Sequence, residues 1–219
     1  MRRIGDTAIA AVTAAALCTG VWLLAGGTGP KAPPQPSPAQ ASQATQTARP
    51  GTGSGAGQGG EVPAAPALAP SPPVRVRIPA IGVDAPLTGL GLTPAGSLDV
   101  PPAEDDNLAG WYEAGTTPGE RGTAIVAGHV DNAEGPAVFY RLGALEKGAA
   151  IEVGRRDGSV AVFTVDAVEV YAAKDFPDEK VYGAAARPEL RVITCGGGWS
   201  RGTGYQGNVV VFAHLTGGR

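Results

Sequence analysis

The chain contains two cysteines and two histidines among its 219 residues, so any thiol or imidazole chemistry must come from very few atoms. Cys195 ends the apolar run Leu190–Thr194 and precedes three glycines, where another backbone can approach closely. His129 ends a second apolar run, Thr123–Gly128. A thiol acts as a nucleophile when a base lies beside it or its pKa is lowered, and an imidazole supplies either. We therefore predict that Cys195 and His129 form a reactive pair, although each alone is also compatible with an unreactive core residue.

The compartment of the two thiols supports this prediction. Residues 1–29 contain two arginines followed by an uncharged run, Ala8–Gly27, which is long enough to cross a bilayer as a helix. Arginines on the N-terminal side place that end in the cytoplasm. We predict a retained single-pass membrane anchor, with a cleaved signal peptide as the alternative. Cys18 then lies in the bilayer, and Cys195 is a lone thiol in an extracellular domain, which indicates reactivity.

The next segment, residues 30–73, is dominated by small and polar residues and holds eleven of the 20 prolines. Such a segment cannot bury enough apolar surface to offset its conformational entropy. We predict a disordered linker that holds a folded domain, residues 74–219, away from the membrane. That domain is long enough to form a core of its own.

Short runs rich in β-branched residues recur through residues 74–219 and are bounded by Gly, Pro and Asp, as is typical of strands. The expected strands are Val74–Ile78, Gly82–Leu87, Thr123–Ala127, Ala150–Gly154, Val160–Tyr171, Leu190–Thr194 and Asn208–His214. Short helices are expected near Ala103–Leu108, Ala137–Leu142 and Lys180–Ala186. The pattern predicts a single all-β barrel or sandwich.

Charge and residue counts exclude several classes of function. The chain has 17 Lys+Arg against 20 Asp+Glu, a net charge of -3, which excludes a nucleic-acid binder that relies on massed positive charge. The two cysteines and two histidines are poorly placed for a zinc site. We expect neither a metal nor an organic cofactor.

The sequence around both candidate residues resembles the sortases, membrane-anchored cysteine transpeptidases of Gram-positive bacteria. The matching motifs are Val126–His129, Leu190–Cys195, the opening Val76–Val83, Glu134–Leu142 after the histidine, and the closing strand Asn208–Ala213. The form Ile193–Gly197 resembles the class F sortases of actinobacteria. The resemblance covers essentially all of residues 74–219.

This resemblance implies an eight-stranded β-barrel on an N-in, C-out membrane anchor. It also implies that Cys195 attacks an LPXTG-like sorting signal near the C-terminus of a secreted protein and forms a thioacyl intermediate. An amine from a peptidoglycan precursor or a pilin lysine would then release the product. His129 would act as the general acid and base.

The third site residue is less defined by the resemblance, because many sortases have an arginine at the head of the last strand and this chain has Asn208 there. Arg201, in the glycine-rich loop after Cys195, is our first candidate for stabilising the oxyanion, since a guanidinium offers a fork of N–H donors. Asn208 is the second, and Thr194 is a candidate for positioning the substrate.

Two further polar residues have weaker cases. Asp131, two residues after His129, could orient the imidazole ring but is also compatible with an ordinary loop carboxylate. We expect His214 to be structural.

Two other functions remain compatible with parts of the pattern. An L,D-transpeptidase also has histidine before cysteine, but the Ser-His-Gly-Cys setting of its nucleophile is absent. A papain-like protease has the reverse order. A non-catalytic, wall-facing β-domain on a membrane tether would tolerate replacement of Cys195 by alanine, whereas a sortase would not.

Overall fold

The computed structural model describes residues 32–36 and 63–219. The predicted anchor, residues 1–29, and much of the predicted linker lie outside the described residues. The described residues from Pro33 onward belong to one structural unit. Within the described part of the chain, no helix is long and apolar enough to cross a membrane.

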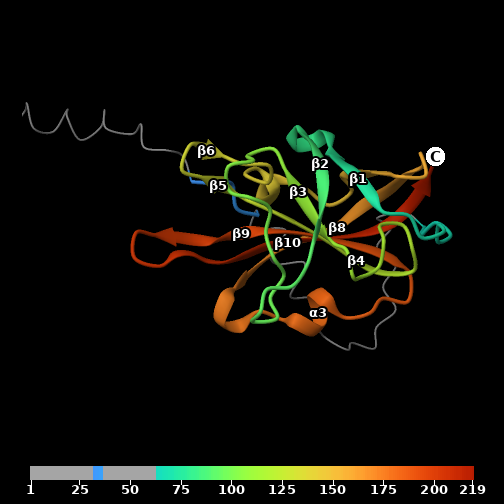
Figure 1. Cartoon of the computed structure of the whole chain (residues 1–219). Helices are drawn as coiled ribbons and strands as arrows, with labels where there is room; N and C mark the ends of the chain where they lie inside the picture. Colours follow the sequence, from blue (N-terminus) through green and yellow to red (C-terminus); the bar gives the residue numbers. More distant parts are fainter. Residues whose placement is uncertain (1–31, 37–62) are drawn as a thin grey trace, which may run out of the picture. The chain divides into compact units, whose positions relative to one another are not determined.

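Eight strands close into a barrel in the order β1-β2-β3-β4-β9-β10-β8-β7, and β5 pairs with β6 beside it (Figure 1). The strands are β1 Pro73–Ile78, β2 Val83–Leu90, β3 Ala109–Tyr112, β4 Gly122–Gly128, β5 Asp131–Asn132, β6 Gly135–Pro136, β7 Ala150–Arg155, β8 Val160–Ala172, β9 Pro188–Ser200 and β10 Gly204–Gly218. The predicted all-β, eight-stranded barrel is confirmed.

Helical structure is limited to short segments in the described residues. They are the 3-10 turns η1 Pro79–Ile81, η2 Leu142–Ala144 and η3 Ala173–Asp175, and the α-helix α3 Asp178–Tyr182. The helices expected near Ala103–Leu108 and Ala137–Leu142 are wrong, because both segments form turns, the second of which leads into η2. The helix expected near Lys180–Ala186 overlaps α3. The pattern also missed β3, whose four residues are too few to show an alternation.

The barrel wall around β4, β9 and β10 is apolar on both sides. Val126, Val192 and Val211 face the barrel interior and belong to the main core. Ile125 on the outer side belongs to a second cluster with Val181 of α3. Because α3 covers this outer face, the three strands are nearly continuous apolar runs in the sequence.

Two parts of the predicted linker contact the barrel. Leu68 packs against the main core. Pro34 and Gln35 lie so close to Gly143 that an added Cβ would stand 2.1 Å from the Pro34 carbonyl oxygen. The Gly197 N–H donates to Gln35 Oε1 at 3.4 Å. These residues therefore do not meet the expectation of disorder throughout residues 30–73. Gly143 has no side chain, so the backbone of Pro34 and Gln35 can lie directly against it.

Candidate active site

Cys195 lies near the middle of β9 and faces the outer side of the barrel wall. The outer-side residue Ile193 precedes it by two positions, and successive side chains of a strand alternate between faces. Its side chain is exposed, and no disulfide engages its thiol. The thiol is therefore accessible to a substrate that approaches from outside the barrel.

His129 reaches the same level of the barrel through the parallel pairing of β4 with β9. Their register pairs Ala127 with Ile193. β4 ends at Gly128, and the same register continued by two residues would align His129 with Cys195, on strands that lie about 4.8 Å apart while they are paired. His129 thus leaves the end of β4, whereas Cys195 lies within the neighbouring β9.

A buried hydrogen bond fixes this level one residue earlier on each strand. Thr194 Oγ1 donates to the Gly128 carbonyl oxygen at 2.8 Å. The Thr194 side chain therefore faces the strand that precedes His129, and it ties the backbone before the thiol to the backbone before the imidazole. Thr194 thus bonds the backbone of β4 immediately before His129.

The imidazole of His129 has a partner from the loop between β2 and β3. Its Nε2 lies 2.7 Å from the carbonyl oxygen of Pro101. A carbonyl only accepts, so Nε2 donates this bond and Nδ1 is the basic nitrogen of the neutral ring. Sequence alone gave no signal for Pro101, which is 28 positions from His129.

The two candidates for the third site residue lie in different places. Asn208 on β10 is the direct cross-strand partner of Cys195. Arg201 is exposed in the turn beyond the pair formed by Ser200 and Gly204. Five residues of fully extended chain would span about 16 Å, and the positive φ of Gly197 and Gly198 makes the path from Cys195 to Ser200 shorter than that. The β9–β10 register pairs Asn208 directly with Cys195, whereas Arg201 lies in the turn at the end of the ribbon.

A carboxylate also acts on the thiol. Burial by surrounding atoms, and secondly the charge of Asp131, raise the pKa of Cys195 above its ordinary value. The Tyr205 hydroxyl donates a hydrogen bond to Asp131 Oδ2. Asp131 is therefore bonded to the β10 side of the site, whereas the sequence suggested the His129 ring as its possible partner.

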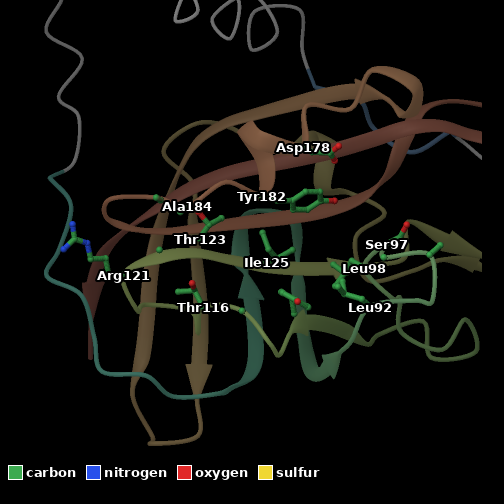
Figure 2. A pocket seen from close by; sticks show the side chains of 16 residues that line it. Leu92, Ser97, Leu98, Thr116, Arg121, Thr123, Ile125, Asp178, Tyr182 and Ala184 are labelled. Atoms are coloured by element: carbon green, nitrogen blue, oxygen red, sulfur yellow. The ribbon is translucent and has the colours of Figure 1, made fainter.

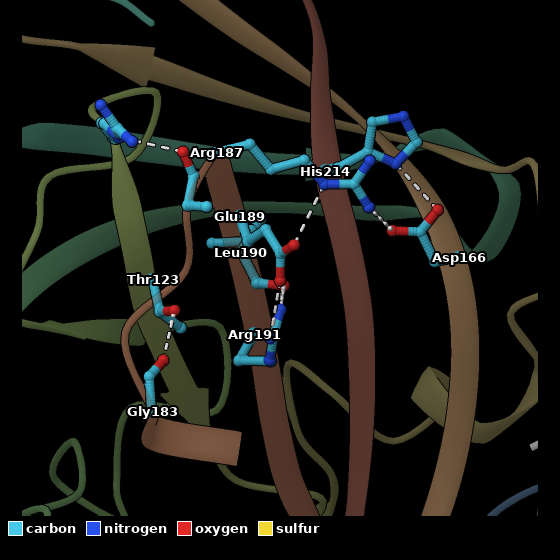
Figure 3. Close-up of polar contacts among 10 residues, drawn as sticks. Thr123, Asp166, Gly183, Arg187, Glu189, Leu190, Arg191 and His214 are labelled. Atoms are coloured by element: carbon cyan, nitrogen blue, oxygen red, sulfur yellow. Dashed lines mark hydrogen bonds and ion pairs between the residues drawn. The ribbon is translucent and has the colours of Figure 1, made fainter. Parts of the chain in front are cut away.

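His214 lies elsewhere, in a polar network on the outer face of the barrel (Figure 3). It is buried, and its Nδ1 lies 2.8 Å from Asp166 Oδ1. Its cross-strand partner Glu189 is bonded by Arg191 at 2.7 Å and by Arg187 at 3.1 Å. These contacts favour the structural role that we expected for His214.

A pocket of about 990 Å³ opens on the outer face of β4 beside Thr123 and Ile125, near the start of that strand (Figure 2). Leu92 and Leu98 from the loop after β2, Ile125 from β4 and Tyr182 from α3 line it. Arg121 lies at its edge in Figure 2. The sequence did not reveal this pocket, because its walls come from three separate segments.

Metal binding has no candidate in the described part of the chain, where no group of three or more His, Cys, Asp or Glu side chains could hold an ion. Trp199, which follows the three glycines after Cys195, is 60% exposed and does not pack into the barrel.

The fold is an eight-stranded closed barrel in which the strand that carries Cys195 pairs in parallel with the strand that leads to His129. The family model for the Sortase domain matches residues 76–216, and the chain belongs to the sortase family. The members of this family are cysteine transpeptidases.

Solved structures agree on the fold. Sortase A from Listeria monocytogenes has a TM-score of 0.51 at 16% identity, over 68% of this chain and 90% of that one. The SrtA sortase from Actinomyces oris has a TM-score of 0.50 at 19% identity, over 73% of this chain and 89% of that one. No curated protein matches the chain significantly in sequence.

Proposed function

We propose that this protein is a transpeptidase that cleaves an LPXTG-like sorting signal through a thioacyl intermediate on Cys195. The observation that carries the proposal is the register of β4 and β9, whose last pair, Ala127 with Ile193, lies two residues before His129 and Cys195 on the two strands. The buried bond from Thr194 to Gly128 makes this arrangement rigid.

In the first step the Cys195 thiolate attacks the carbonyl carbon between Thr and Gly of the signal. A carbon–sulfur bond forms, the peptide C–N bond breaks, and the leaving amine takes a proton from the His129 imidazolium. In the second step an amine attacks the thioester, gives a proton to His129 and restores the thiolate. Because the pKa of Cys195 is raised, the thiol is mostly protonated at neutral pH, so an adjacent base is needed.

For the developing oxyanion we propose the side-chain amide of Asn208, because it lies opposite Cys195 and offers N–H donors. Arg201 is the competing candidate. A long side chain on a folded-back turn could reach the site once substrate binds, but its place beyond Ser200 and Gly204 gives that role less support.

We propose that the pocket over β4 takes the apolar N-terminal part of the signal. Leu92, Leu98 and Ile125 give it an apolar lining. Ile125 is on the outer face of β4, four positions before His129, so an extended peptide in the pocket could continue along the strand to Cys195. Four residues of extended chain span about 13 Å, which is the reach that such a peptide needs.

The partners follow from this reaction. They are secreted proteins with a C-terminal LPXTG-like signal, and an acceptor amine from a peptidoglycan precursor or a pilin lysine. We propose that residues 1–29 anchor the enzyme in the cell membrane with the N-terminus in the cytoplasm. The described barrel would then act outside the cell, with the linker between them, as a sortase of the class F type.

The proposal is tested with the full chain in detergent, a fluorogenic LPXTG-type peptide and a soluble amine. We expect a thioacyl adduct on Cys195 by mass spectrometry and a transpeptidation product, both absent in Cys195→Ala. If no peptide of a broad panel gives the adduct, the non-catalytic β-domain becomes the better explanation.

The same assay separates the two candidates for the oxyanion donor. We expect Asn208→Ala to reduce kcat about a hundredfold, and Arg201→Ala to change it less than threefold. The reverse order would assign the donor to Arg201.

A further inference from the structure

One hydrogen bond joins the two sides of the candidate site. The Tyr205 hydroxyl donates to Asp131 Oδ2 across 74 positions of sequence. Asp131 opens β5 two residues after His129, and Tyr205 lies on β10 three residues before Asn208. The bond therefore spans from the loop that leaves the imidazole to the strand that faces the thiol.

The β9–β10 ribbon that carries Tyr205, residues 196–207, pairs with itself and also makes the contacts of Gly197 N–H with Gln35 Oε1 and of Gly207 with Ala172 of β8. It is rich in glycine, and the β9–β10 register is irregular between Tyr205 and Gly207. The hydrogen bond between the Ser200 and Thr203 hydroxyls stays within the ribbon's own turn. Figure 1 shows the ribbon, in red, extending toward the end of the barrel where β5 and β6 lie. The bond from Tyr205 to Asp131 adds a contact between this ribbon and β5, the strand that follows His129.

The negative charge of Asp131 acts on the Cys195 thiol. Together with burial, it raises the pKa of Cys195. Burial, and secondly the bond to Asp131, raise the pKa of Tyr205 well above its ordinary value, so this phenol is a permanent donor at physiological pH. Two other titratable groups, Tyr140 and Cys195, also raise the pKa of Tyr205. The titratable group nearest in strand order to the thiol is His129, which follows β4, the parallel neighbour of β9.

We propose that Asp131 and Tyr205 form a positioning pair for the acyl transfer. The hydrogen bond holds the β9–β10 ribbon against the loop after His129. By donating to the carboxylate, Tyr205 also weakens the effect of its negative charge on the Cys195 sulfur. The proposal rests on the proposed function for its catalytic consequence, but its effect on the thiol is independent of turnover.

Two substitutions separate the bond from the charge. Asp131→Asn keeps an oxygen acceptor for Tyr205 and removes the negative charge. Tyr205→Phe removes the donor and leaves the charge. The matched control is Tyr171→Phe, because the Tyr171 hydroxyl also donates to a carboxylate, that of Glu169, and neither acts on the thiol.

The first readout is the rate at which iodoacetamide alkylates Cys195 as a function of pH. In the full chain it is followed by mass spectrometry on the tryptic peptide 192–201, which distinguishes Cys195 from Cys18. At pH 7 we expect Asp131→Asn to react about threefold faster or more, and Tyr205→Phe about threefold slower, with Tyr171→Phe unchanged. No change in Asp131→Asn, or shifts of both variants in the same direction, would overturn the proposal.

The second readout is transpeptidation. We expect Tyr205→Phe to lower kcat about tenfold with little change in KM for the peptide, because the ribbon is displaced and the peptide pocket is not. The pH optimum should move down in Asp131→Asn. If the two variants shift the alkylation rate in opposite directions but the protein forms no thioacyl adduct, the proposed transpeptidase function is refuted and the Asp131–Tyr205 positioning pair is supported. If the enzyme is active but the alkylation rates do not shift, only the positioning pair is refuted.

Discussion

The hydrogen bond from Thr194 to Gly128 offers the sharpest test of how the barrel assembles its site. Thr194→Val removes the hydroxyl and keeps the shape of the side chain. The bond is 2.8 Å long and buried, so its loss leaves the Gly128 carbonyl without this donor, at a cost of about 1–3 kcal/mol. For a domain of this size, a loss of about 2 kcal/mol lowers the melting temperature by roughly 4–8 °C.

The same change should reduce activity beyond what the loss of stability explains. The bond ties the residue before Cys195 to the residue before His129, and a misplacement of about 1 Å can reduce the rate a hundredfold. We expect kcat of Thr194→Val to fall about tenfold or more at a temperature where the variant is fully folded.

Thr216→Val is the matched control, because Thr216 also donates to a backbone carbonyl, that of Val162, at 3.3 Å. It lies eight residues beyond Asn208 on β10, about 26 Å away along the strand. The control should lose stability and keep its kcat. If Thr194→Val also keeps its kcat while its melting temperature falls, the bond is structural and our account of the site is incorrect.

Two further predictions concern stability and the linker. At Glu189, burial favours the protonated form, but hydrogen bonds and charge from Arg191 and Arg187 outweigh it and lower the pKa of the carboxyl. A depressed native pKa contributes stability above the unfolded value of about 4.3 and loses it as pH falls through the native one, so Glu189→Gln should flatten the loss of stability below about pH 4 in urea titrations. Gly143→Ala should displace Pro34 and shift the amide resonance of Gly197, because its nearest neighbours are linker backbone atoms. The control Gly91→Ala, where a Cβ meets nothing within 4 Å, should leave the Gly197 resonance unchanged. Equal spectra for the two variants would contradict the contact between Gly143 and the linker.

Much of the fold was predictable because it depends on local patterns. All seven predicted runs overlap strands of the structure, since β-branched residues between glycines and prolines favour strands wherever they occur. β3 escaped prediction because Ala109–Tyr112 is short and is held by its neighbours. The segment near Ala103–Leu108 was wrongly predicted as helical, because its helix-compatible residues are offset by the neighbouring prolines and turn formers.

The candidate site divides in the same way. The sequence by itself singled out Cys195 and His129, because a rare residue type at the end of an apolar run is visible without any contact information. It placed Arg201 before Asn208 as the candidate oxyanion donor, because a local pattern does not show that the antiparallel register pairs Asn208 with Cys195.

The sequence thus determined the residue types available for chemistry and the all-β class of the domain. Only the tertiary structure decided their relations: the parallel pairing of β4 with β9, the Pro101 carbonyl on the imidazole, and the bond between Asp131 and Tyr205. The physical reason is that strand order and register are set by long-range packing of the two barrel faces, and a local pattern does not encode which distant strand becomes a neighbour.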